Sequence, residues 1–200
     1  MPPSLPESGV AGTFIDAARE VLAEGMAKIE HCVNQLDDAG VWWRPAEGQN
    51  SIANLMLHLS GNVRQWIIAG VGGAAPDVRD RPREFADRSG RPKAEILGLL
   101  RRTVAEADGV LSRLTGDGLT QPRRIQGFET NVLAAVFDTI AHFRGHTQEI
   151  IHMTRDRLGE QYVFYFVPQG PEQTSAGADK KRPLPSASLG FLGVLAFVPG

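Results

Sequence analysis

The sequence is poor in cysteine. Cys32 is the single cysteine among 200 residues, so the chain cannot form an intramolecular disulfide, a cysteine-based zinc site or an iron–sulfur site. A metal ion bound by this chain must therefore be held by nitrogen and oxygen ligands. Five histidines are available as nitrogen donors: His31, His58, His142, His146 and His152.

An excess of basic residues and a long apolar run are also absent. Lys and Arg number 21 against 23 Asp and Glu, a formal net charge of -2, and nucleic-acid-binding proteins usually carry a basic excess. The nearest approach to a long apolar run, Leu189–Val198, is shorter than the about 18–20 residues of a membrane helix. Residues 1–7 carry no basic start and no apolar core. We expect no nucleic-acid partner, no membrane association and a cytoplasmic location.

Four long stretches show apolar residues at three- and four-residue steps, which predicts four helices. The expected ranges are Thr13–Leu36, a second helix from Asn50 or Ser51 to Gly70, Pro92–Leu114, and a fourth from Thr130 or Asn131 to Leu158. Asp37–Gly40 is expected to stop the first helix, and residues 115–127 are expected to be irregular. Residues 76–92 form a connector long enough for a crossover or a functional loop.

The fold class follows from these ranges. An apolar fraction of 42% and a charged fraction of 22% are typical of a globular chain with a real core. We predict an all-α protein, an antiparallel four-helix bundle with a long crossover. The β-branched and aromatic residues of Gln161–Val167 predict a short extended C-terminal segment. The predicted domains are an N-terminal extension (1–12), the bundle (13–168) and a flexible tail (169–200) rich in Gly, Pro, Ser, Ala and Lys.

Two histidines share one face of the fourth predicted helix. His142 and His146 are four residues apart, which places both imidazoles on one side, a turn apart, where they can share a metal ion. His58 lies at a similar boundary position beside the apolar stripe of the second helix. The alternative is that these are polar residues at helix edges that bind nothing. Three protein ligands with an open position would be typical of a catalytic metal.

Other polar residues lie near these histidines in sequence. Asp138 precedes His142 by four residues and Glu149 follows His146 by three, so either carboxylate is a candidate to orient a ligand or act as a general base. Asn62 and Gln65 follow His58 and are candidates to line the pocket. Arg79, Arg81 and Arg83 are candidates to bind an anion at the mouth, although charged loops are usually only solvated.

The segments Asn50–Asn62 and Ile140–Ile150, with the connector Trp42–Pro45, resemble the motifs of DinB/YfiT-like proteins. The resemblance covers about Phe14–Val167 and points to a branch of unassigned function. It implies a four-helix bundle that is often a homodimer. It also implies a divalent metal, usually zinc or nickel, on three histidines, here His58, His142 and His146.

Two functions remain open on the sequence. The first is a metal-dependent enzyme acting on a small molecule, a thiol-dependent S-transferase or a hydrolase by resemblance, with a low-molecular-weight thiol as possible co-substrate. Coordination would lower the pKa of a thiol or water and produce a nucleophile near neutral pH. The second is a non-catalytic, metal-binding dimeric bundle with a stress-associated role. A plain helical scaffold is a third, weaker alternative.

Overall fold

The computed structural model describes residues 9–73 and 76–166 of the chain. The predicted tail 169–200 and most of the predicted N-terminal extension 1–12 lie outside these residues. Among the described residues, no helix is long and apolar enough to cross a membrane.

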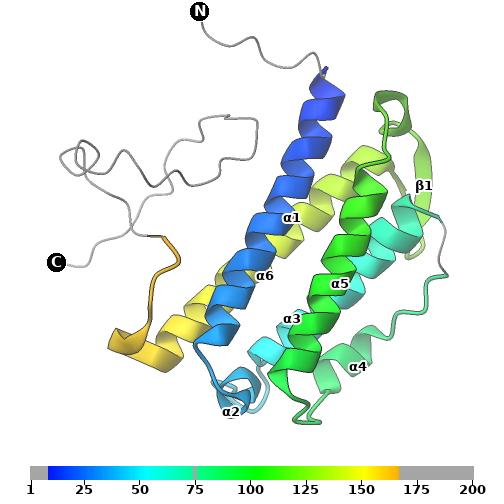
Figure 1. Ribbon diagram of the computed structural model, residues 1–200. Helices are drawn as coiled ribbons and strands as arrows, with labels where there is room; N and C mark the ends of the chain where they lie inside the picture. The colour runs from blue at the N-terminus through cyan, green and yellow to red at the C-terminus, as the bar shows by residue number, and fades with distance from the viewer. Residues whose placement is uncertain (1–8, 74–75, 167–200) are drawn as a thin grey trace, which may run out of the picture. The chain divides into compact units, whose positions relative to one another are not determined.

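The structure is mostly helical, as predicted. Its long elements are α1 (Val10–Asn34), α3 (Ile52–Val63) continuing into the π-helix η1 (Arg64–Val71), α5 (Lys93–Leu111) and α6 (Val132–Leu158). α1 packs against α6 and α5, and α3 packs against α5 and α6, so the four enclose one core. Figure 1 shows α1 and α6 crossing alongside each other. The predicted helix positions agree with these bounds to within a few residues.

Two helix starts are explained by capping. Ser51 precedes α3, and its hydroxyl accepts from the Asn54 backbone N–H while the Asn54 side chain accepts from the Ser51 N–H. This reciprocal capping box satisfies two backbone donors. Asn131 caps α6 by accepting from the Ala134 N–H. Both residues were candidates from the sequence. α1, in contrast, begins at Val10, three residues before the expected Thr13.

Several short elements were not predicted. α2 (Asp38–Trp42) follows α1 where only a stop was expected, and α4 (Arg81–Ala86) lies within the long connector. The 3₁₀ turn η2 (Gly116–Gly118) and the hairpin β1 (Pro122–Ile125) and β2 (Phe128–Asn131) replace the irregular stretch expected there. The hairpin turn has positive φ at Gln126 (54°) and Gly127 (84°), as a two-residue turn requires.

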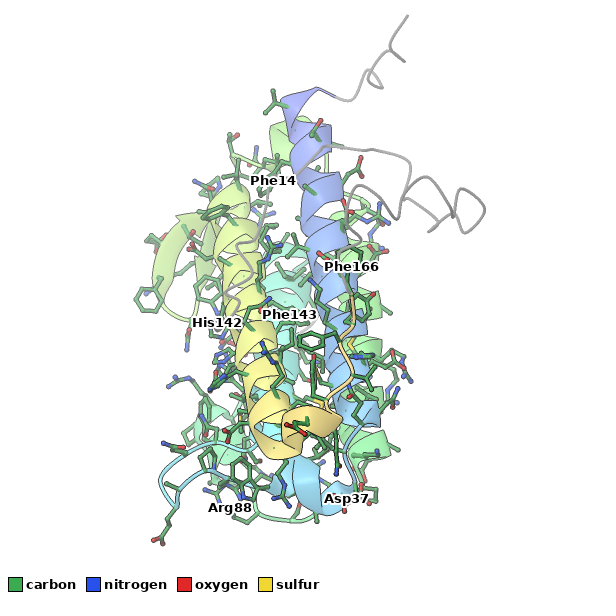
Figure 2. All side chains as sticks on the ribbon, turned by 90° about the vertical axis from the view of Figure 1, so that its left-hand side faces the viewer. Phe14, Asp37, Arg88, His142, Phe143 and Phe166 are labelled. Atoms are coloured by element: carbon green, nitrogen blue, oxygen red, sulfur yellow. The ribbon has the colours of Figure 1, made fainter. Side chains whose placement is uncertain are left out.

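A close approach between α1 and α6 forms the centre of the core. Phe143 is fully buried, and a Cβ added at Gly25 of α1 would lie 2.7 Å from the Phe143 ring. Only a glycine admits the ring at this distance. Figure 2 shows Phe143 between the ribbons of α6 and α1, whereas His142, the preceding residue, lies on another side of α6. The packing of Phe143 therefore determines which way His142 faces.

The chain after α6 makes a short 3₁₀ turn, η3 (Gly159–Gln161), and then runs along α1. The amide of Gln35 pairs with both backbone groups of Val163: Val163 N–H donates to Gln35 Oε1 (2.7 Å), and Gln35 Nε2 donates to Val163 O (3.1 Å). This part of the predicted extended segment forms no β-ladder, because a side-chain amide takes the place of a neighbouring strand. Val167 lies outside the described residues.

Candidate metal centre

His58 from α3 meets His142 and His146 from α6. The ring centroids lie 5.1 Å apart for His58 and His142, 5.1 Å for His58 and His146, and 4.5 Å for His142 and His146. One nitrogen from each ring lies within 4.8 Å of the other two. The Nε2 atoms of His58 and His142 are 2.9 Å apart. The structure thus brings together the three histidines that the sequence singled out.

The amphipathic packing of α6 accounts for this arrangement. Phe143 and Thr147 are buried, and each directly follows one of the two histidines of α6. With these two residues buried in the core, His142 and His146 lie half-buried on the flank of the helix. His58 approaches from α3 and is only 3% exposed. The three nitrogen atoms therefore face one another at the boundary between two helices.

The second ring nitrogen of His58 has a carboxylate partner. Nδ1 lies 3.1 Å from Oε2 of Glu84, whose side chain is 11% exposed. Burial alone raises the pKa of Glu84, but hydrogen bonds from Arg79 and His58 outweigh it, so the pKa is lowered. Nη2 of Arg79, which only donates, also lies 3.0 Å from Nδ1 of His58, so Glu84 and Arg79 both approach this nitrogen. When Nδ1 carries the ring proton and donates to Glu84, Nε2 is the atom left to bind a metal.

Gly61 makes room for this carboxylate. A Cβ at Gly61 would lie 1.8 Å from Oε1 of Glu84 and 3.0 Å from Nε of Arg79. Glycine inside a helix costs about 1 kcal/mol relative to alanine. Here the missing side chain lets Glu84 reach His58 across the surface of α3. Gly145 of α6 differs from Gly61, because a Cβ added at Gly145 would meet nothing within 4 Å.

Arg79 is part of the site rather than of its mouth. Its Nε donates to Oε1 of Glu84 (2.8 Å), its Nη2 to Oε2 (2.8 Å) and its Nη1 to Oε1 of Gln65 (2.9 Å). Gln65 in turn donates from Nε2 to Asp77 (2.7 Å). The expected pocket-lining residue Gln65 is therefore buried behind Arg79, and Arg79 is already paired instead of being open to an anion.

The remaining candidates from the sequence are Glu149, Asp138 and Asn62, and they differ in whether they contact a histidine. Glu149 Oε2 lies 2.7 Å from Nδ1 of His146, so this carboxylate orients a histidine as expected. Asp138 is exposed, and within the described part of the chain no hydrogen bond joins it to a histidine. Asn62 is half-buried, and its Oδ1 is fully covered without a hydrogen-bond partner among the described residues.

Electrostatics keeps His142 neutral. Burial is the largest cause, followed by His146, His58, Arg79 and Arg81, and together they lower the pKa of His142 from 6.5 to about 4. The neutral imidazole is the form that binds metals. Three imidazole nitrogens facing one another, with carboxylates behind His58 and His146, match the donor set of a nitrogen-ligated transition metal.

The other two histidines and the cysteine lie outside this cluster. His31 Nε2 lies 2.6 Å from Val163 O, and His152 is exposed. Cys32 is fully buried, and burial raises the pKa of its thiol, which disfavours the reactive thiolate.

The comparison with known families gives one match over most of the chain. A family described as "Protein of unknown function (DUF1572)" matches residues 9–171. The chain belongs to this family. No curated protein matches it. A solved structure described as the conserved protein of locus from Enterococcus faecalis is similar at 17% identity and a TM-score of 0.61. The match covers 70% of this chain and 94% of that one, and it shows a shared fold alone.

In this member of the DUF1572 family, sequence reasoning missed Glu84, which is 26 residues from His58 in a connector without apolar periodicity. Two features of the sequence are related to its role. The connector carries several acidic and basic residues within a few positions, and Gly61 stands unexplained in a helix four residues before Gln65. Neither observation identifies which carboxylate reaches the histidine.

Proposed function

We propose that His58, His142 and His146 bind a divalent transition metal, zinc or nickel. One observation carries the proposal: three imidazole nitrogens converge within 4.8 Å while Nδ1 of His58 lies 3.1 Å from Oε2 of Glu84. Metal-ligating histidines usually donate their second N–H to a carboxylate or carbonyl. In this proposal Glu84 and Glu149 orient His58 and His146, and Asp138 and Asn62 have no ligand role.

The fold proposed with this site is an antiparallel four-helix bundle of the DinB/YfiT type, spanning residues 13–168. The motifs in α3 and α6 and the packing of the four long helices support it. A homodimer is proposed as well. Leu133 and Phe137 of α6 and Phe128 of β2 are exposed apolar side chains (42%, 56% and 62%), an unusual cost for a monomer surface unless a partner covers them.

The proposed activity is that of a metal-dependent enzyme acting on a small molecule, a thiol-dependent S-transferase or a hydrolase. Three protein ligands leave a coordination position open, where a bound metal acts as a Lewis acid and lowers the pKa of its ligand. The residues of this chain hold the three nitrogens in place and keep His142 unprotonated. A non-catalytic metal-binding bundle with a stress-associated role is the alternative, and it shares the site but not the activity.

Metal analysis of protein purified without a histidine tag tests the site. About one equivalent of a transition metal per chain is expected, and His142→Ala is expected to lose it. His152→Ala is the matched control, because His152 lies on the same helix, is exposed and is outside the cluster. Absence of metal after addition of zinc and nickel, or equal retention in His142→Ala, would refute the site.

Catalysis is tested separately. The metal-loaded protein is incubated with a panel of thiols and small electrophiles and with hydrolysable esters and amides, with His58→Ala as control. Turnover that disappears in His58→Ala supports the enzyme. Equal rates in the two proteins would favour the non-catalytic alternative.

A further inference from the structure

Arg81 lies beside the histidine cluster on a stack of aromatic rings. The Phe85 ring lies 4.6 Å from the His58 ring, tilted by 35°. The guanidinium carbon of Arg81 lies 5.2 Å from the centre of the same Phe85 ring, a cation–π distance. Both residues belong to α4, one turn apart. Phe85 therefore holds a positive charge close to the metal-binding nitrogens.

The acidic residues around Arg81 already have other partners. Asp77 accepts from Gln65 and from the Arg79 backbone, and Asp80 accepts from the Arg83 backbone. Glu84 pairs with Arg79 and His58, and Asp87 pairs with Arg91. None of the carboxylates in the described residues forms an ion pair with Arg81.

The charged groups in contact with the histidine cluster also affect which ligand the site could bind. Glu84 is neutralised by Arg79, and within residues 9–73 and 76–166 Glu149 is the other carboxylate in contact with a histidine of the cluster. Asp138 is exposed and bonded to none of the three rings. A divalent ion bound by the three histidines would add positive charge near the Arg81 guanidinium.

We propose that Arg81 binds the carboxylate of a small-molecule ligand whose other end occupies the open position of the metal. A single guanidinium matches the charge of a carboxylate and presents two parallel N–H donors to it, whereas phosphate recognition usually gathers several cationic groups. The ligand class is thus a short molecule with a metal-binding donor at one end and a carboxylate at the other. This inference rests on the proposed metal site and adds the chemistry of its ligand.

Two probes that differ in one group test the proposal: 3-mercaptopropionate and its neutral amide. Each is titrated into cobalt-loaded protein, and binding of the sulfur is followed by the cobalt–thiolate absorption. The wild-type protein is expected to prefer the carboxylate about five-fold, the value of one partly exposed ion pair. Arg81→Gln is expected to lose this preference while its affinity for the amide stays unchanged, and Arg81→Lys is expected to keep part of it.

Arg83→Gln is the matched control, because Arg83 is an exposed arginine of the same helix without a ring contact to the cluster. It should retain the full preference. If the preference is equal in wild type and Arg81→Gln, or if Arg83→Gln removes it equally, the role of Arg81 is refuted while the metal site stands. If the wild-type protein binds no cobalt, both proposals fail together.

Discussion

Adding one methyl group at Gly61 is expected to break the hydrogen bonds between Glu84 and His58. The new Cβ of Gly61→Ala would lie 1.8 Å from Oε1 and 2.7 Å from Cδ of Glu84, far inside van der Waals contact. The carboxylate must move, and a groove of about 240 Å³ beside it gives it room. Arg79 then loses its partner while its side chain is only 5% exposed.

Two opposing contributions determine the size of the effect. Alanine in place of glycine stabilises a helix by about 1 kcal/mol. Removing one partner of a buried ion pair costs about 3–5 kcal/mol, because a charge is left without compensation. We therefore expect Gly61→Ala to be destabilised by about 2–4 kcal/mol, which lowers the melting temperature by roughly 4–16 °C in a protein of this size.

Gly145→Ala supplies the matched control for this experiment. It adds the same methyl group to a helix, but its Cβ meets nothing within 4 Å, so a gain of about 1 kcal/mol is expected. Urea unfolding and thermal melting of both variants give the comparison, and metal affinity should fall about 10–100-fold in Gly61→Ala alone. Equal stability of the two variants would refute the packing of Glu84 against Gly61.

Three further predictions concern single contacts. Glu84→Gln should weaken zinc binding by about 10–100-fold in a chelator competition, since the amide holds the His58 tautomer less well; unchanged affinity would contradict this role. Phe143→Ala should cost about 3–5 kcal/mol in urea unfolding, because the ring is fully buried; a loss below 1 kcal/mol would show that α1 and α6 do not pack around it. The hydrogen bond from Arg19 lowers the pKa of Asp108, so this pair stabilises the fold above the unfolded pKa and its contribution disappears as the pH falls through the lower, folded value. Asp108→Asn should remove that contribution, at most about 1 kcal/mol for a half-exposed pair; stability curves of equal slope between pH 5 and 2 in variant and wild type would speak against it.

The long helices could be predicted because their signals are local. The capping residues Ser51 and Asn131 stand where the apolar periodicity begins, and both the cap and the periodicity are written in consecutive residues. α2, α4 and the two strands of the hairpin span four to six residues each, too few for a periodic pattern to show. α4 has no buried residue, so no apolar stripe marks it in the sequence either.

The candidate site also has one part that could be predicted from the sequence and one part that could not. His142 and His146 are paired by helix geometry alone, and the position of His58 beside an apolar stripe places it at a helix boundary. Glu84 reaches His58 across a connector, so its role depends on the path of the chain after η1. A pattern search finds residues that share a helix face, whereas a contact made by a connector requires coordinates.

The connector between η1 and α5 gives the site two parts of separate origin. The three nitrogens belong to α3 and α6, whose positions depend on the core, whereas Glu84, Phe85 and Arg81 all arrive on the single short helix α4. Exchanging residues 77–87 alone would change the charge, the aromatic wall and the ligand preference around an unaltered set of nitrogens. Substitutions within these eleven consecutive residues can therefore change the chemistry of the site while the core sequence stays unchanged.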